Sequence, residues 1–351
     1  HRPPETPTGF WVGEFDIRTV RDGSEVARHL PQDREHCILL GKIDEPAQAF
    51  GIERINPSSV LNLLHHARAV KTGYELECMR GASRRAVRGH TAAEEAFRAG
   101  APEYEIHLAY CRAVSHTERE LPYDNIVALN ENAAVLHYQH QAREAPAELR
   151  SLLIDAGARV NGYASDVTRT WSFGSAEFSE LIARMDRLQR ELVAEVRAGV
   201  EFIDLHLEAH RKLAGVLTEA GLATGSADAL IGNGVTSAFL PHGLGHLLGI
   251  QVHDVGGFMA DESGRTIDRP SGHPWLRLTR RLEPDMVLTI EPGLYFIDLL
   301  LANLEGTPAA QMVNRERIDR LRPFGGIRIE DNVRVLPDGC ENLTRDAFAA
   351  L

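Results

Sequence analysis

The sequence predicts an α+β protein with two domains, and three observations support this. The chain has 351 residues, 43% hydrophobic and 25% charged, which is ordinary for a soluble protein with a large core. Near residue 70, Thr72 and Glu75 form a capping-box pattern that begins a long helical stretch. Beyond residue 120, short strand-like runs precede two further helical stretches. We therefore expect a small α/β domain over residues 1–66 and a larger domain over residues 71–351.

The N-terminal segment has the pattern of a small α/β unit. Residues 10–66 contain short helical and strand-like stretches, and CILLGKI at 37–43 is typical of a buried strand. The chain opens at His1 without a methionine, so we expect a unit that is either short or cut at its beginning.

Charge, hydropathy and cysteine usage exclude several classes of partner. The net charge is −12 and the lysines and arginines are scattered, which argues against nucleic-acid binding. The longest apolar runs are too short to span a bilayer. The four cysteines have no CxxC spacing and resemble buried thiols of a reducing compartment. We expect a cytoplasmic protein without nucleic-acid or membrane partners.

Periodicity places the elements of the larger domain. The expected helices cover 72–100, 102–118, 178–197 and 203–220, with Gly221 as a stop after the last. The expected strands are DNIVALN, AVLHYQ, SLLIDAG, DVTRTWS, MVLTIE and the segment 326–335. The polar residues 258–277 between them are interpreted as a surface loop.

Four acidic residues lie at the tips of strand-like segments, where carboxylates are unusual. They are Asp155, Asp166, Glu291 and Glu330. Burying isolated carboxylates together costs many kcal/mol unless cations neutralise them. Two divalent ions would bring four positive charges against these four negative ones.

The hairpin between two of these acids allows a geometric prediction. Asn161-Gly162 is typical of a two-residue turn, and counting back from it places Asp155 opposite Thr168 and Asp166 opposite Gly157. The two aspartates then share a face as diagonal neighbours, about 7 Å apart at the backbone. They could hold a metal pair, or they could pair with arginines or face water.

The stretch LPHGLGHLLGIQVHD at 240–254 concentrates histidine among glycine and apolar residues. Each of His242, His246 and His253, taken alone, is more simply a hydrogen-bonded core residue than a ligand. Three together favour a site. The glycines allow a close backbone approach, and the leucines supply a dry wall.

These motifs together resemble a known family. LLIDAG, an aspartate eleven residues on in DVTRT, PHGLGHLLGIQVHD, TIEPGLYF and GIRIED resemble the five motifs of the M24 metallopeptidases, which have the pita-bread fold. The resemblance covers residue 71 to the end, and weakly the part before. It is greatest to Xaa-Pro dipeptidases, or prolidases, and next to proline-specific aminopeptidases. It implies a curved antiparallel sheet covered by helices, a homodimer, and two metal ions bound by Asp155, Asp166, His246, Glu291 and Glu330.

The resemblance also implies roles around the metals. His253 would stabilise the oxyanion and His242 would line the substrate pocket. His137 in AVLHYQ resembles a further catalytic histidine, with a plain strand histidine as the alternative. Tyr295 would donate a hydrogen bond beside the metals and substrate. Arg328 would orient a ligand carboxylate, or serve only as the salt-bridge partner of a buried glutamate.

The residue types predict the chemistry. Four carboxylates and one imidazole form an oxygen-rich site that suits Mn²⁺, Co²⁺ or Fe²⁺ and tolerates Zn²⁺. Ligand softness alone does not choose among these ions, and Mn²⁺ is the one we expect. A water between two dications is deprotonated near neutral pH and attacks a peptide carbonyl. Glu291 is the candidate to take its proton and pass it to the leaving proline nitrogen.

The segment before TIEPG bears on substrate choice. Arg277 in HPWLRLTR resembles the prolidase arginine that holds the free carboxylate of a dipeptide with C-terminal proline, although Arg280 and Arg281 are close by. The alternatives are an Xaa-Pro aminopeptidase or a phosphotriester hydrolase on the same site. A catalytically dead binding module is a third, but it would be expected to lose metal ligands.

Overall fold

A computed structural model describes residues 12–42 and 50–351, and the chain divides into two compact units, 1–64 and 65–351. The first unit contains the 3-10 helices η1 (Val12–Glu14) and η2 (Gly23–Arg28), and α2 (Ser58–Arg68) spans the boundary. The predicted strand at 37–43 is wrong for its described residues. Only Leu39 pairs, through an isolated bridge to Ile55, and Leu40 is 43% exposed. Without a longer pairing partner among the described residues, an apolar run alone does not make a buried strand. Ile43 lies outside the described residues.

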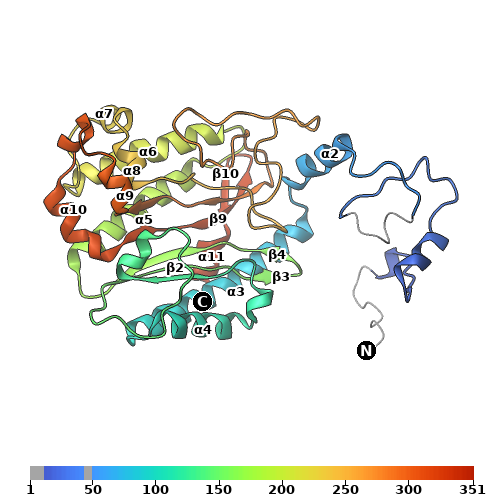
Figure 1. Cartoon of the computed structure of the whole chain (residues 1–351), viewed down its shortest axis with the longest axis horizontal. Helices are drawn as coiled ribbons and strands as arrows, with labels where there is room; N and C mark the ends of the chain where they lie inside the picture. The colour runs from blue at the N-terminus through green and yellow to red at the C-terminus, as the bar shows by residue number, and fades with distance from the viewer. Residues whose placement is uncertain (1–11, 43–49) are drawn as a thin grey trace. The chain divides into compact units, whose positions relative to one another are not determined.

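The larger unit is α+β, as predicted. Its α-helices are α3 (Gly73–Arg98), α4 (Glu103–Val114), α5 (Ala176–Glu195), α6 (Phe202–Glu219), α7 (Ala227–Gly232), α8 (Val235–Phe239), α9 (Asp298–Ala302), α10 (Arg315–Leu321) and α11 (Leu343–Ala349). Its 3-10 helices are η3 (Glu118–Glu120), η4 (Asn130–Ala134), η5 (Pro308–Gln311) and η6 (Arg322–Phe324). Figure 1 shows α3 beside α4, and α5 beside α6, with strands between the two pairs.

The strands pair antiparallel in every sheet that the described residues form. They are β1 (Ile126–Leu129), β2 (Ser151–Asp155), β3 (Arg159–Val160), β4 (Tyr163–Ala164), β5 (Thr168–Ser172), β6 (Val287–Ile290), β7 (Gly293–Tyr295), β8 (Gly326–Arg328), β9 (Asp331–Leu336) and β10 (Gly339–Asn342). The sheet orders are β1-β2-β5, β10-β9-β6, β3-β4 and β7-β8. A bridge between Thr168 and Glu330 connects the first sheet to the chain after β8.

Local sequence signals explain where the helices begin and end. At the start of α3, Glu75 N donates to Thr72 Oγ1 (3.4 Å) and Thr72 N donates to Glu75 Oε2 (2.7 Å), so the predicted capping box is confirmed. Helix α4 ends at Val114, before the predicted 118, because Ser115 takes a left-handed conformation with φ 55°. The predicted stop after α6 is also confirmed, since Gly221 has φ 65°.

The hairpin register is confirmed. Val160 pairs with Tyr163 around Asn161-Gly162, and Asp155 pairs with Thr168 between β2 and β5. Both turn residues have positive φ, 50° and 88°, as a type I′ turn requires. Gly157 has no room for a side chain, since a Cβ there would lie 2.0 Å from Ser165 O. The tight strand pair brings Asp155 and Asp166 to one end of the sheet.

One predicted strand of the larger unit is wrong and another is interrupted. AVLHYQ is a turn after η4, because the buried Glu103 carboxylate accepts hydrogen bonds from Leu129 N (2.8 Å) and Ala142 N (2.7 Å) and bends the chain between them. The last strand, expected over 326–335, is interrupted between β8 and β9. Glu330 lies in that interruption and pairs only through its bridge to Thr168.

The two largest of four apolar clusters among the described residues pack the helices of the larger unit against its strands. The larger one packs α5 and α6 against β6, β8 and β9, and the second packs α3 and α4 against β1 and β2. Many of these side chains are fully buried, including Phe178, Phe202, Leu152 and Ile154, so each contributes on the order of 1.5–3 kcal/mol of transfer free energy. In the part of the chain that the structure describes, no helix is both long and apolar enough to cross a membrane.

Candidate metal centre

A pocket of about 510 Å³ opens at the end of the central strands. It is lined by all five residues that the resemblance assigns to metals, which we call the carboxylate centre: Asp155, Asp166, His246, Glu291 and Glu330. Further lining residues are Leu136, His137, Pro241, His242, Gly243, Gly245, His253, Trp275, Arg277 and Arg328. The carboxylate centre therefore brings together residues separated by up to 175 positions, from Asp155 to Glu330.

The histidine stretch reaches the centre by packing against β6. Thr289 N donates to His246 O and Glu291 N donates to Leu244 O, each at 2.9 Å. Gly245 permits this approach, because a Cβ there would lie 2.0 Å from Thr289 O. The pairing places His246 Nε2 3.6 Å from Glu291 Oε1 and 3.4 Å from Asp166 Oδ2.

Tyr123 connects the two aspartates. Its hydroxyl lies 2.7 Å from Asp155 Oδ1 and 2.5 Å from Asp166 Oδ1. One hydroxyl carries one proton, so it satisfies the two carboxylates only in part. Glu330 has a hydroxyl partner of its own, since Thr168 Oγ1 donates to its Oε2 at 2.6 Å.

Arg328 is the one guanidinium that pairs with a carboxylate of the centre among the described residues. Its Nη2 donates to Asp155 Oδ2 at 2.5 Å, while Nη1 donates to Tyr295 Oη (2.8 Å) and Nε to Thr168 Oγ1 (3.1 Å). The alternative that the hairpin aspartates pair with arginines therefore holds for Asp155 and not for Asp166. One cation still leaves most of the negative charge of four buried carboxylates unbalanced.

The electrostatics of the carboxylate centre fit divalent cations. Burial, and then repulsion from Asp166, raises the pKa of Asp155 to about 6 against the pull of Arg328. Burial also raises the pKa of Glu291 to about 7 and holds that of Glu330 well above its usual range. For Asp166 burial acts in the same direction, but the hydrogen bond and charge of His246, together with the hydrogen bond of Tyr123, outweigh it and the pKa is lowered. Cations bound nearby would stabilise the ionised carboxylates and lower these raised pKa values.

The spacing of the donor atoms also fits a metal. Asp166, His246 and Glu330 each offer a ligand atom, and these atoms all lie within 4.8 Å of one another. His246 Nδ1 lies 3.0 Å from Leu247 O, which leaves Nε2 directed at the acids. The carboxylate centre can therefore hold a divalent ion with oxygen and imidazole ligands.

The other predicted site residues surround this centre at different depths. His242 Nε2 lies 2.9 Å from Tyr295 Oη, and the His253 ring packs 4.4 Å from the His246 ring, centroid to centroid. Burial lowers the pKa of His242 to about 3 and that of His253 to about 4, so both imidazoles are neutral near pH 7. His137 lines the pocket from the turn after η4. Tyr295 is fully buried and contacts His242 and Arg328.

The three arginines of the segment before TIEPG have different surroundings. Arg277 is exposed and lines the pocket, and none of the described residues forms a hydrogen bond or ion pair with its side chain. Arg280 is buried and pairs with Glu283 at 2.5 Å. Arg281 donates to Gly199 O at 3.0 Å, away from the pocket. Of the three, only Arg277 has a free guanidinium directed to the pocket.

Sequence reasoning missed Tyr123, Thr168, Thr289 and Trp275. Thr168 and Thr289 stand within two residues of Asp166 and Glu291 in strand patterns, so alternation on a shared face was an available signal. Tyr123 reaches the aspartates from a loop outside every motif, and no local pattern indicates it.

An antiparallel α+β unit whose pocket brings four acids together with the imidazole of His246 is typical of metal-dependent hydrolases. The chain belongs to metallopeptidase family M24, because the model of this family matches residues 77–337. Residues 1–66 match the model of the N-terminal domain of Xaa-Pro dipeptidase.

Similar proteins agree with this assignment. The chain is 52% identical to the Xaa-Pro dipeptidase of Stenotrophomonas maltophilia (strain K279a), with 100% of this chain and 79% of the relative covered. It is 51% identical to the Xaa-Pro dipeptidase of Aeromonas hydrophila subsp. hydrophila, over 99% of this chain and 79% of that protein. The structure of zinc-substituted Escherichia coli aminopeptidase P in complex with product has a TM-score of 0.71 and 27% identity, over 92% of this chain and 71% of that one. The predicted pita-bread fold is thereby confirmed.

Proposed function

We propose that this chain hydrolyses Xaa-Pro dipeptides, with two divalent ions bound by Asp155, Asp166, His246, Glu291 and Glu330. The observation that carries the proposal is the pocket in which these five residues converge beside the free guanidinium of Arg277. The names of the relatives at 51–52% identity support the same substrate class. When bound, the ions supply Lewis acidity to the peptide carbonyl and lower the pKa of the attacking water.

Side chains of the pocket transfer the proton of the attacking water and bind the carbonyl oxygen of the substrate. Glu291 takes the proton of the water and transfers it to the proline nitrogen, and Thr289 Oγ1, 3.2 Å from Glu291 Oε1, orients that carboxylate. His253, kept neutral by burial, donates a hydrogen bond toward the carbonyl oxygen. His242 lines the pocket around it, with Nδ1 2.8 Å from Gly243 O and Nε2 2.9 Å from Tyr295 Oη. His137 lines the same pocket. Tyr295 and Arg328 fix His242 and Asp155 through the contacts described above.

Substrate length is set at the Arg277 end of the pocket. A guanidinium binds the free carboxylate of a dipeptide through two parallel hydrogen bonds, while a longer peptide presents an amide there. Trp275, which is 67% exposed beside Arg277, supplies an apolar surface for the proline ring. Arg277 thus discriminates by charge and Trp275 by shape.

Further proposals concern the metal, the domains and the assembly. Mn²⁺ suits the four carboxylates of the centre better than softer ions do, while Co²⁺, Fe²⁺ and Zn²⁺ remain compatible. We also propose domains over residues 1–66 and 71–351, a homodimer and a cytoplasmic location. The match of the family's N-terminal domain to residues 1–66 supports the first boundary.

A pair of peptide series tests the proposed function. Purified protein loaded with Mn²⁺ is assayed on Xaa-Pro dipeptides and on tripeptides with proline in the second position. We expect cleavage of the dipeptides at a kcat/KM well above that of the tripeptides. Preference for the tripeptides would show an aminopeptidase instead. Absence of bound metal under metal-replete conditions would favour a binding module.

A further inference from the structure

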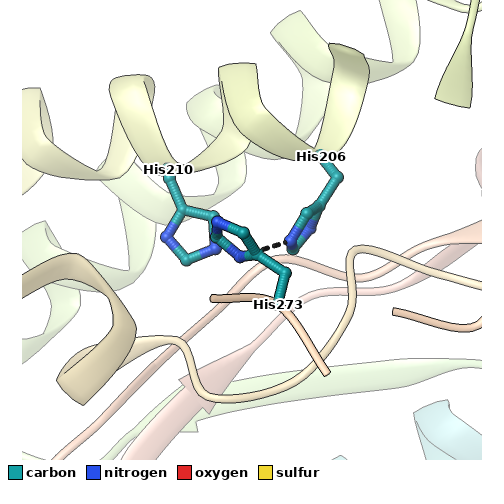
Figure 2. Close-up of side chains that lie close together, drawn as sticks. All are labelled: His206, His210 and His273. Atoms are coloured by element: carbon teal, nitrogen blue, oxygen red, sulfur yellow. Dashed lines mark hydrogen bonds between the residues drawn. The ribbon is translucent and has the colours of Figure 1, made fainter. Parts of the chain in front are cut away.

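Three histidines meet outside the carboxylate centre. His206 and His210 lie one turn apart on the same face of α6, and His273 reaches them from the loop between α8 and β6, as Figure 2 shows. We call them the histidine cluster. The rings lie 4.6–4.9 Å apart, centroid to centroid, in three edge-to-face or tilted pairs.

The nitrogen atoms converge more closely than the rings. His206 Nε2 lies 2.9 Å from His273 Nδ1, and one nitrogen from each histidine lies within 4.8 Å of the other two. Two imidazole nitrogens bound at about 2.05 Å to one tetrahedral zinc ion lie about 3.3 Å apart. The observed pair is already close to that separation, and the nitrogen of the third ring lies within 4.8 Å of both.

Two buried nitrogens of the cluster have no hydrogen-bond partner among the described residues. They are His206 Nδ1 and His210 Nε2, and both residues are only 1% exposed. His206 faces His273 through Nε2, so of these two atoms only His210 Nε2 would gain a partner from an ion at the cluster. A buried polar atom without a partner destabilises the fold. His210 Nδ1 is 3.0 Å from Thr236 Oγ1, so Nε2 is the nitrogen left to bind a ligand, with the threonine fixing the ring.

The charge state and the available space suit a transition metal. Burial lowers the pKa of His206 to about 2, that of His210 to about 4 and that of His273 as well, so all three imidazoles offer lone pairs near pH 7. A cavity of about 190 Å³ adjoins His206 and His273 and has room for a water as a further ligand. The metal-ligand group formed here contains histidines alone, which favours zinc over the ions that oxygen-rich sites prefer.

We propose that the histidine cluster binds one Zn²⁺ ion, separate from the ions of the carboxylate centre. The ion fastens the segment 272–277 to α6, and this segment carries Trp275 and Arg277 to the larger pocket. The zinc site stands independently of the reaction. Its consequence for substrate positioning rests on the proposed dipeptidase function.

Anomalous diffraction at the zinc edge locates the ion directly. Crystals of the full chain are equilibrated with Zn²⁺, and we expect a peak among the three histidine nitrogens in addition to peaks in the carboxylate centre. Peaks in the carboxylate centre alone would overturn this inference and leave the proposed function standing. A peak at the histidine cluster alone would support this inference and contradict the proposed metal centre.

Matched variants test the same site in solution. His210→Phe should lower bound zinc by one ion per chain, while His140→Asn, at an exposed histidine, should leave it unchanged. Hydrogen exchange of residues 272–278 should slow on adding Zn²⁺ in the wild type and stay fast in His210→Phe. Equal zinc content in both variants, or exchange that zinc does not alter, would show a hydrogen-bonded packing cluster. Should His210→Phe fail to fold, the diffraction experiment decides alone.

Discussion

The carboxylate centre and the histidine cluster lie on either side of one wall, since both cavities are lined by Pro241, His242 and Trp275. Both consist of buried polar side chains, but different physics constrains them. Burial first, and then repulsion between the acids, raises the pKa values of Asp155 and Glu291, and these raised values indicate cations. Neutral imidazoles do not repel, and only converging nitrogens and missing partners indicate an ion. Charge therefore identifies the first site and geometry the second.

The largest effect is expected from a substitution in the carboxylate centre that leaves the histidine cluster intact. His246→Ala removes the imidazole that lies between Asp166 and Glu291, so we expect loss of one metal from the carboxylate centre and of nearly all turnover. Zinc at the histidine cluster should persist. Metal content per chain and kcat on an Xaa-Pro dipeptide measure both outcomes, and normal turnover would contradict the ligand assignment.

Arg277→Ala should affect substrates unequally. Loss of a charged hydrogen bond to a carboxylate costs about 1.5–3 kcal/mol, which is about 10- to 100-fold in kcat/KM for dipeptides. Longer peptides should lose much less, and the metal content of both sites should not change. Arg281→Ala is the matched control, because its side chain faces Gly199. An equal loss on both substrate classes would exclude carboxylate recognition by Arg277.

Tyr123→Phe should weaken the carboxylate centre without dismantling it. The hydroxyl touches Asp155 and Asp166 but is not a predicted ligand, so its loss should lower metal affinity about tenfold, at the low end for such supporting residues. Competition with a chelator measures the affinity. Unchanged affinity together with unchanged kcat would show that the hydroxyl only fills space. Zinc at the histidine cluster serves as the internal control.

The sequence predicted most of the fold because the signals there are local. The Thr72 capping box, the Asn161-Gly162 turn and the helical periods of α5 and α6 each involve residues close in the chain, and all appear within two residues of the expected positions. AVLHYQ failed because Glu103, far earlier in the chain, bends it through hydrogen bonds that no local pattern contains. The break at Glu330 likewise depends on a partner in another strand.

The two sites differ in the same way. The predicted ligands stood out because acids at strand tips are unusual wherever they occur. His206 and His210 are spaced four residues apart, a helical ligand spacing that could have been noticed, but His273 lies in a polar loop and joins them only through the tertiary fold. Tyr123 carried no signal at all. Local chemistry is visible in a sequence, and convergence of distant residues is not.

A lone buried histidine tests whether clustering, rather than burial, makes the second site. His90 is fully buried on α3, with Nε2 3.0 Å from Ala156 O, and burial lowers its pKa to about 3. The unfolded chain binds this proton below pH 6.5 and the folded chain only below about 3, so stability falls as the pH drops through that window, by up to about 1.4 kcal/mol per pH unit. His90→Phe should flatten this slope in urea unfolding between pH 5 and 7. His90→Phe should also leave the zinc content unchanged. Loss of a zinc ion from this variant would show that a single buried histidine binds zinc, and that clustering of three histidines is not what makes the second site.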